Sequence, residues 1–494
     1  MSDGTHFDVL IVGAGISGIG AACHLKARRP GSTFAILEGR DSIGGTWDLF
    51  KYPGIRSDSD MPTFGYSFKP WTHRKAIADR NLILDYLRET VTENVIDPHI
   101  RFGYKVLAAE FSSSTAHWTI TAEHSSTGEQ TQFTSRFLFL GTGYYDYESG
   151  FTPDFAAVDE FTGQVIHPQH WPEDLDYAGK RVVVIGSGAT AVTLTPAMAD
   201  KASHITMLQR SPSYILAIPA EDVIANFLNK VLGPKRASRI VRRKNILLAR
   251  GIFKACRRFP RLTRWLLLAL VRLQLPKRFD SDTHFSPRYN PWEQRLCFVP
   301  NGDLFKAIKS GRASVVTDRI DRFTASGIKL ESGQELAADI VVTATGLNML
   351  PFGKIQLSVD GQRVNIPDTT FYKAVMLSGV PNFAFALGYT NISWTLKVDL
   401  ACEYFCRLLD HMDAHGYRTV EPVLDDPDMT RVTANNLKAG YVQRGMGTFP
   451  RGGTRGPWIV DHAYEKDVER LRAGLVEDSA LKFTVATSPA RPAS

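Results

Sequence analysis

The sequence has few cysteines and no long apolar run. Its 494 residues include five irregularly spaced cysteines: Cys23, Cys256, Cys297, Cys402 and Cys406. Their spacing argues against a disulfide framework and against a zinc site, so we expect free thiols and no bound metal. No apolar stretch reaches the roughly 18 residues that a membrane-spanning helix needs, and no signal peptide precedes the first predicted strand. These absences favour a cytoplasmic protein.

Acidic residues are missing from one segment of the chain. The whole sequence carries 58 Lys and Arg against 51 Asp and Glu, for a formal net charge of +7. Residues 235–279 hold fifteen of the basic residues and no acidic one, so the rest of the chain is net negative. The length predicts two or three domains. A content of 44% hydrophobic and 22% charged residues is typical of a globular protein.

A glycine-rich motif near the start of the sequence predicts a dinucleotide site. A short apolar run, expected to form a buried strand, leads into Gly13, Gly15 and Gly18 and then into an apolar helical pattern. The glycines permit a tight turn, a close approach of a pyrophosphate and close packing of helix on strand, and the helix N-terminus favours phosphate charge. The next predicted strand ends at Glu38, where a carboxylate binds a ribose 2′-hydroxyl and repels a 2′-phosphate. We therefore expect FAD here rather than NADPH.

A second motif of the same kind lies in the middle of the chain. Gly186, Gly188 and Ala191 follow another predicted strand and begin another apolar helix. The strand after that helix ends without an acidic residue, at Arg210 and Ser211. A guanidinium in this place binds a 2′-phosphate as a planar fork, helped by the serine hydroxyl. The contrast with the first motif predicts NADPH at the second.

The stretch between the two motifs carries a spaced pattern: Phe161, Gly163, His167, Trp171 and Pro172. Glycine gives backbone freedom and proline stiffens the path, as in a hinge. The spacing resembles the fingerprint of type I Baeyer–Villiger monooxygenases. Related flavin monooxygenases that oxidise nitrogen and sulfur usually carry another aromatic residue in place of this tryptophan. The resemblance extends over nearly the whole chain and is closest to the bacterial ethionamide-activating monooxygenase group.

The resemblance implies an α/β fold with two Rossmann-like dinucleotide-binding domains, one for FAD and one for NADPH, and a helical insertion. A strand at 339–344 is expected to return the chain to the FAD-binding domain. Along the chain we expect the first part of the FAD-binding domain (1–145), a linker or hinge with the fingerprint (146–180), the first part of the NADPH-binding domain (181–213), the helical insertion (214–294), the second part of the NADPH-binding domain (295–335), the second part of the FAD-binding domain (336–486) and a disordered tail (487–494).

A loop rich in glycine and aromatic residues, at 44–58, resembles the second motif of the same family. The family places this loop against the flavin, which implies cofactor contacts for Gly45, Thr46 and Trp47. Its last residue, Asp58, is expected to contact the cofactor and to face the active site as a catalytic residue. The nearby Asp60 is a competitor for that role.

An arginine far along the chain completes the expected site. Arg295 falls where the family has a catalytic arginine close to the flavin. The preceding residue is Gln294, where the family usually has a lysine that also contacts the NADPH phosphate, so we expect a softer preference for NADPH over NADH.

The resemblance implies an NADPH-consuming monooxygenase that inserts one oxygen atom of O2 into ketones via a C4a-peroxyflavin, giving esters or lactones, and that also oxidises sulfides. The alternatives are a sulfur- or nitrogen-oxygenating flavin monooxygenase, an uncoupled NADPH oxidase, and a binding module whose flavin is structural.

Residues 214–280 predict several basic amphipathic helices. Three interpretations stay open: a solvated cap over the cleft, a peripheral membrane contact through residues 235–279, and a nucleic-acid site. Interleaved basic and apolar residues are typical of interfacial helices, whereas no nucleic-acid-reading motif accompanies the charge. We therefore expect no nucleic-acid partner. Residues 434–458 predict a mobile active-site loop, and the stretch after Gly388 is expected near the flavin ring.

Overall fold

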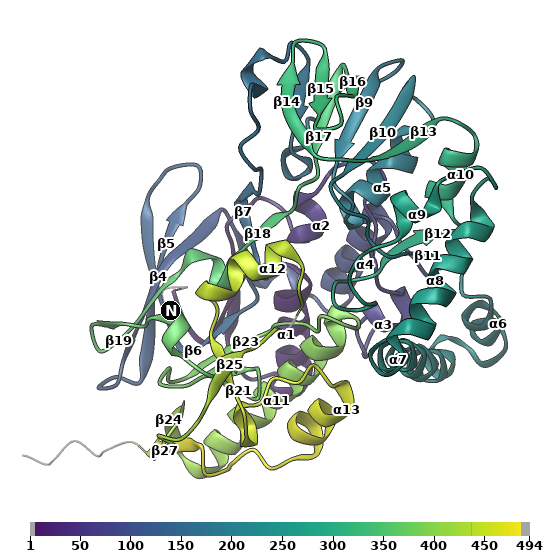
Figure 1. Ribbon diagram of the computed structural model, residues 1–494. Helices are drawn as coiled ribbons and strands as arrows, with labels where there is room; N and C mark the ends of the chain where they lie inside the picture. Colours follow the sequence, from purple (N-terminus) through teal and green to yellow (C-terminus); the bar gives the residue numbers. More distant parts are fainter. Residues whose placement is uncertain (1–4, 436, 486–494) are drawn as a thin grey trace, which may run out of the picture.

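The computed structural model describes residues 5–435 and 437–485, whose strands form two large sheets and several small ones (Figure 1). The first large sheet has nine strands in the order β20-β19-β4-β5-β6-β1-β2-β3, with β23 also paired to β6. These strands are β1 (His6–Val12), β2 (Phe34–Glu38), β3 (Ile100–Phe102), β4 (Tyr104–Ser112), β5 (His117–His124), β6 (Gln130–Leu140), β19 (Gln356–Val359), β20 (Gln362–Arg363) and β23 (Phe383–Phe385).

The centre of the first sheet is parallel. Strand β1 lies between β2 and β6 and pairs in parallel with both. Leu10 and Ile11 are fully buried on opposite faces of β1, which explains why its sequence is a continuous apolar run. Strands β4, β5 and β6 pair with one another in antiparallel fashion and continue the same sheet. One face is covered by α1 (Ile16–Arg28), α4 (Arg80–Glu93) and α11 (Trp394–His415).

The second large sheet has five strands in the order β13-β10-β9-β17-β8, all parallel. Helices α5 (Ala189–Met198) and α10 (Asp303–Lys309) cover one face, and a small antiparallel sheet covers the other. The parallel centre of the first sheet and the all-parallel second sheet confirm an α/β fold with two Rossmann-like units. The strands are β8 (Gln164–Ile166), β9 (Arg181–Ile185), β10 (His204–Gln209), β13 (Ala313–Thr317) and β17 (Ile340–Thr343), with β14 (Ile320–Thr324), β15 (Gly327–Leu330) and β16 (Glu335–Ala337) in the small sheet.

Two expected boundaries are wrong. Strand β17 pairs with β8 and β9, so the chain leaves the second unit after Thr343 and not at residue 336. The stretch expected as a linker, 146–180, supplies β8 as the edge strand of the second sheet. An apolar strand followed by a small-residue turn fits either sheet, so the sequence pattern alone does not assign it. The two-stranded connection between the units is β7 (Tyr145–Gly150) with β18 (Leu347–Met349).

The expected helical insertion is present and lies to one side of both sheets (Figure 1). The side chain of Asp222 caps the first helix by accepting a bond from the Ala225 amide at 2.9 Å. Pro234 and Pro260 begin the next two helices, where a missing N–H costs nothing. Strand β11 (Ile215–Ile218) precedes them and pairs with β12 (Cys297–Pro300). The helices are α6 (Val223–Leu232), α7 (Pro234–Arg258), α8 (Pro260–Gln274) and α9 (Ser281–Phe285).

The expected glycine-rich loop at 434–458 contains regular structure. It holds α12 (Gly440–Gly445), which packs on β18, and β26 (Arg451–Gly453), which pairs with β25 (Arg431–Thr433). Near the C-terminus, β24 (Tyr417–Pro422) pairs with β27 (Leu481–Val485). The expected tail from Thr487 lies outside the described residues. Among the helices that the structure describes, none combines the length and apolar character needed to cross a membrane.

Candidate functional site

The first glycine motif forms a tight crossing between β1 and α1. Gly13 has a φ of 97°, and a Cβ there would lie 2.9 Å from the carbonyl oxygen of Gly141. A Cβ on Gly18 would overlap the carbonyl oxygen of Gly13, so this position has no room for a side chain. Gly15 is the residue before the first turn of α1. The crossing therefore presents bare backbone at a helix N-terminus, which suits a pyrophosphate.

Glu38 ends β2 beside this crossing and is only 7% exposed. One carboxylate oxygen accepts the Ala14 amide at 2.7 Å and the other accepts the Arg40 amide at 3.0 Å. Burial raises the pKa of Glu38, and the two amide bonds oppose that shift. Nearby, Nη1 of Arg40 is buried without a hydrogen-bond partner among the described residues. A carboxylate and an unused donor next to the glycine crossing fit the ribose and other polar groups of a dinucleotide.

The loop at 44–58 contacts both glycine motifs. Gly45 has a φ of 55°, and a Cβ on it would lie 3.1 Å from the Cα of Gly15. Thr46 hydrogen-bonds the Tyr147 hydroxyl at 3.1 Å. Farther along the loop, a Cβ on Gly54 would lie 2.5 Å from Ala197 in α5. The short helix α2 (Thr46–Leu49) lies near the start of the loop. Its Trp47 packs against Phe64, which comes after the loop.

Asp60 is a structural residue in this fold. Its side chain caps α3 (Met61–Phe64) by accepting the Thr63 amide at 3.1 Å, and it also accepts from Asn245 at 2.7 Å. Asp58 makes no side-chain hydrogen bond within the described part of the chain. The geometry therefore separates the two candidates, because only Asp58 keeps its carboxylate free.

The second glycine motif repeats the crossing with an open outer side. Gly186 has a φ of 142°, and a Cβ there would overlap the carbonyl oxygen of Ala344. A Cβ on Gly188, by contrast, would meet nothing within 4 Å, and Ala191 is fully buried behind it. Arg210 and Ser211 are exposed at the end of β10, and Arg210 has no ion-pair partner in the part that the structure describes. Its guanidinium is free to bind an anion.

Arg295 and Asp58 come together from distant parts of the sequence. Burial works to lower the pKa of Arg295, but the charge of Asp58 and three nearby tyrosines outweigh it and raise the pKa above its ordinary value. Burial raises the pKa of Asp58, against the opposing charges of Arg295 and Arg56. Burial next to Asp58 also raises the pKa of Cys297 to about 12. The pair is a permanent cation held beside a desolvated carboxyl.

Arg295 lines a cavity whose wall is mainly apolar and aromatic. Among the described residues of this wall, Arg295 carries the one permanent charge. The Tyr144 ring stacks on Trp394, with the ring centroids 5.0 Å apart. The hydroxyls of Tyr144 and Tyr145 hydrogen-bond each other at 2.8 Å. The wall includes Tyr144, Met349, Tyr389, Trp394, Tyr441 and Met446.

Two buried polar atoms lie close to this cavity without a partner in the described chain: Oδ1 of Asn391 and Oγ of Ser393. They precede α11, and their neighbours Thr390 and Trp394 line the cavity. Unpaired buried groups are costly unless a ligand satisfies them. The stretch expected near a flavin ring therefore fits a polar ring edge.

The sequence interpretation missed Tyr441, Met446 and His462 as cavity residues. Burial lowers the pKa of His462, which keeps it neutral while it bonds the Ala434 carbonyl at 3.0 Å. Their signal in the sequence is weak because no long apolar period surrounds them: Tyr441 lies in the six-residue helix α12, and Met446 directly follows that helix. The pair Tyr144-Tyr145, directly after the small-residue turn at 141–143, was a local signal that could have been used.

The five fingerprint residues lie away from the cavity wall. Phe161 packs on Phe323 in the second unit, and a Cβ on Gly163 would overlap a backbone carbonyl. His167 donates from Nε2 to the Gly346 carbonyl at 3.2 Å, and burial lowers its pKa. Trp171 is half-buried against the second core, and Pro172 follows it. These contacts join β8 to the strand connection between the two units.

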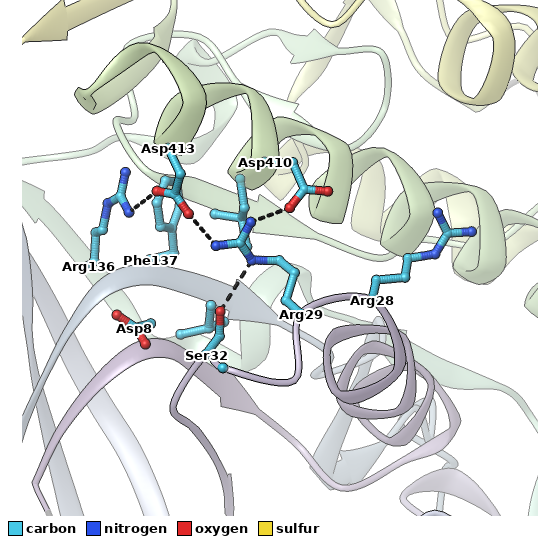
Figure 2. Close-up of a pocket in the computed structure, with 11 residues that line it drawn as sticks. Asp8, Arg28, Arg29, Ser32, Arg136, Phe137, Asp410 and Asp413 are labelled. Atoms are coloured by element: carbon cyan, nitrogen blue, oxygen red, sulfur yellow. Dashed lines mark hydrogen bonds and ion pairs between the residues drawn. The ribbon is translucent and has the colours of Figure 1, made fainter.

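A separate hollow lies between β1, the end of α1 and the side of α11 (Figure 2). Arg29 pairs there with Asp410 and Asp413, and Arg136 pairs with Asp413 at 2.6 Å. The hollow is therefore lined by charges that already satisfy one another. It joins two helices of the first unit and offers no free group for chemistry.

Three comparisons place these features among known proteins. The sequence model of the flavin-binding monooxygenase-like family matches residues 7–378. The FAD-containing monooxygenase EthA of Mycobacterium tuberculosis is 52% identical over 98% of this chain and 99% of its own. A steroid monooxygenase bound to NADP has the same fold, with a TM-score of 0.77 and 20% identity over 98% of this chain and all of its own. Cyclohexanone monooxygenase from Rhodococcus sp. Phi1 bound to NADP+ matches with a TM-score of 0.75 and 21% identity, over 98% of this chain and all of its own.

Proposed function

The chain belongs to the flavin-binding monooxygenase-like family and is thus a flavin monooxygenase, an oxidoreductase; from this premise we propose that it is a Baeyer–Villiger enzyme. It binds FAD in the first unit and NADPH in the second, and it inserts one oxygen atom of O2 into ketones to give esters or lactones. The observation that carries the proposal is Arg295, a permanent cation on the wall of a mainly apolar cavity, whose charge interacts with that of Asp58.

The assignment of the two cofactors rests on the ends of β2 and β10. Glu38 is buried and negative when ionised, so it accepts ribose hydroxyls and repels a 2′-phosphate. Arg210 is exposed and unpaired within the described chain, so it binds that phosphate. Gly13, Gly15 and Gly18 would hold the FAD pyrophosphate, with Gly45, Thr46 and Trp47 beside it. Gly186, Gly188 and Ala191 would hold that of NADPH, with Ser211 next to Arg210.

FAD, when bound, would supply the redox chemistry: acceptance of hydride from NADPH and delivery of one oxygen atom of O2 to the substrate. The residues of the chain position the substrate, supply charge in the cavity and exclude water from it. Arg295 stabilises the negative charge that develops on the carbonyl oxygen of the ketone. A preorganised donor of this kind contributes about 3–4 kcal/mol to catalysis.

Asp58 acts as a positioning residue for Arg295. The negative charge of its carboxylate attracts the guanidinium and reduces the field that the cation exerts in the cavity. The apolar wall keeps water from the reacting groups. The hinge about which the two units close is formed by the five fingerprint residues: Phe161, Gly163, His167, Trp171 and Pro172.

We propose sulfides as secondary substrates of the same cavity. A sulfide is apolar, so it fits this wall as a ketone does. Oxygen transfer to sulfur builds no oxyanion on the substrate, so it needs Arg295 less. A sulfur- or nitrogen-oxygenating enzyme and an uncoupled NADPH oxidase are the other outcomes, and the products distinguish them.

The test is a product balance with the FAD-loaded enzyme. The proposal predicts that each ester formed from an aliphatic ketone consumes one NADPH and one O2. Release of hydrogen peroxide equal to the NADPH consumed, with no ester from ketones, would overturn it in favour of an oxidase. Sulfoxide formation without any ester would assign the enzyme to sulfur oxygenation instead.

A further inference from the structure

Most large apolar side chains that are exposed in the described chain gather on the helical insertion. Fifteen of the twenty-two lie between residues 223 and 273. Val223 is 75% exposed, Trp265 61% and Leu273 81%. Single exposed apolar residues need no explanation, but a concentration of this kind marks an interaction surface.

These side chains follow the helical period on three consecutive helices that pack on one another. On α6 the exposed stripe is Val223, Ile224, Phe227 and Val231. On α7 it is Ile240, Leu247, Leu248 and Ile252, and on α8 it is Leu262, Trp265, Leu266, Leu270 and Leu273. Spacings of three and four residues place each stripe along one face of its helix.

The opposite faces of the helices are already packed on the protein. Ala225, Val241, Leu267 and Val271 are buried, so the exposed stripes are not an unfinished core. Ion pairs fasten the helices as well: Arg242 with Asp399 at 2.9 Å, Lys244 with Asp222 at 2.6 Å, and Arg250 with Glu465. The three helices are therefore held in place with their apolar stripes turned outward.

The charge around the stripes has one sign. Ten of the fifteen Lys and Arg in 235–279 make no ion pair or side-chain hydrogen bond with the described chain, and this segment contains no acidic residue. They include Lys235, Arg239, Lys254, Arg257, Arg258 and Arg261, all exposed. An occupant of this surface must therefore be anionic and must also cover apolar side chains.

We propose that α6, α7 and α8 form a docking face for an anionic lipid bilayer. Phospholipid headgroups neutralise the free cations, and the boundary of the acyl chains covers the apolar stripes. A second copy of this chain would bring the same unpaired cations into contact with themselves. A nucleic acid would neutralise the charge but leave Trp265 and its apolar neighbours in water. Of these three occupants, the bilayer is the one that satisfies both properties of the face.

The helices of the docking face also contact the candidate cavity through their inner side. Ile246 on the inner side of α7 packs on Tyr389, which lines the cavity, and on Leu396 of α11. Docking would place the cavity close to a store of apolar molecules. This consequence for substrate delivery rests on the proposed function, whereas the docking itself does not.

Flotation of the FAD-loaded protein with vesicles tests the docking. We expect the protein to float with phosphatidylcholine–phosphatidylglycerol vesicles and to stay at the bottom with phosphatidylcholine alone. The triple substitution Arg257→Gln, Arg258→Gln and Arg261→Gln should reduce the floated fraction about tenfold, because each cation near an anionic surface adds to binding. Lys201→Gln, Lys306→Gln and Lys309→Gln, three exposed lysines of the second unit, form the matched control and should float normally.

A second pair of variants tests the apolar part. Trp265→Ser with Leu273→Ser should reduce flotation, and Leu475→Ser, at a residue 82% exposed outside the face, should not. Anionic vesicles should also shift the tryptophan emission of the wild type to shorter wavelength, and Trp265→Phe should lose that shift while keeping its fold.

Three results would overturn the docking proposal. The first is wild-type protein that fails to float with anionic vesicles. The second is equal flotation of the wild type and the Trp265→Ser, Leu273→Ser variant. The third is a dimer that this variant converts to monomer while flotation is unchanged, which would make the face a contact between copies. Binding to a DNA duplex that only the arginine substitutions weaken, without flotation, would assign the face to nucleic acid. Since vesicle binding needs no turnover, a failed product balance leaves this test intact.

Discussion

The charges of Asp58 and Arg295 interact although 237 positions separate them in the sequence, and each opposes the effect of burial on the pKa of the other. Asp58 ends the loop that contacts both glycine motifs, and Arg295 lies two residues before β12, at the end of the helical insertion. The pair therefore forms only when the two units are assembled, and it is the centre of the candidate site.

Replacing Arg295 with alanine should strongly reduce ester formation while NADPH still reduces the flavin. Loss of one preorganised donor lowers kcat by about 100- to 1,000-fold. Sulfide oxidation should fall far less. Stopped-flow reduction and product analysis measure the steps separately, and Arg288→Ala, an exposed arginine of the same segment, is the control. Ester formation at the normal rate in Arg295→Ala would disprove the assigned role.

The pH profile of ester formation should show the protonation of the Asp58 carboxyl. Burial raises its pKa above the ordinary aspartate value of about 4, so the carboxyl gains its proton as pH falls through that raised value. We expect kcat to fall on this acid side, because the neutral form no longer positions Arg295. Asp58→Asn should be slower and lack this limb. Asp60→Asn should keep the limb and lower the melting temperature, since Asp60 caps α3.

Replacing Arg210 with alanine should raise the KM for NADPH by roughly tenfold to a hundredfold, the value of a charge-assisted hydrogen bond. The KM for NADH should hardly change, because NADH has no 2′-phosphate. Steady-state kinetics with both cofactors measure this. Equal changes for the two would place the phosphate site elsewhere. Gln294→Lys should act in the opposite direction and strengthen the preference for NADPH.

The substitution Glu38→Gln should reduce the FAD that the purified protein retains. The buried carboxylate accepts two backbone amides and, in our proposal, the ribose hydroxyls. Loss of such charged bonds costs about 1.5–3 kcal/mol. The ratio of flavin to protein absorbance measures retention. Glu148→Gln, an exposed carboxylate paired with Lys105 and Lys354, should retain FAD fully. Full retention of FAD by the Glu38→Gln variant would mean that the ribose binds elsewhere.

Two glycines of the second motif should respond differently to alanine. Gly186→Ala adds a Cβ that overlaps the Ala344 carbonyl at a φ of 142°, so we expect a clear fall in melting temperature. Gly188→Ala adds a Cβ in open space, so the fold should be unaffected. Its KM for NADPH should rise, because the Cβ stands where the pyrophosphate approaches. Normal KM values in a stable Gly188→Ala would argue against that approach.

Several parts of the fold were predictable because their signals are local. Strand β9 begins and ends where the apolar run does, and the glycine spacing at 13–18 and 186–191 marks two strand–turn–helix crossings. Glu38 and Arg210 stand at fixed distances from those crossings. Their different chemistry is readable without a structure, since a carboxylate and a guanidinium select opposite partners.

The pair of nucleotide motifs and the residue type that follows each are therefore readable from the sequence alone. The tertiary structure alone decided the sheet to which β17 belongs, the choice of Asp58 over Asp60, and the cavity wall that Tyr441 and Met446 complete. It also decided which stripes of α6, α7 and α8 stay exposed. The physical reason is range: a motif is set by neighbours along the chain, whereas burial and coupling depend on residues that only folding brings together.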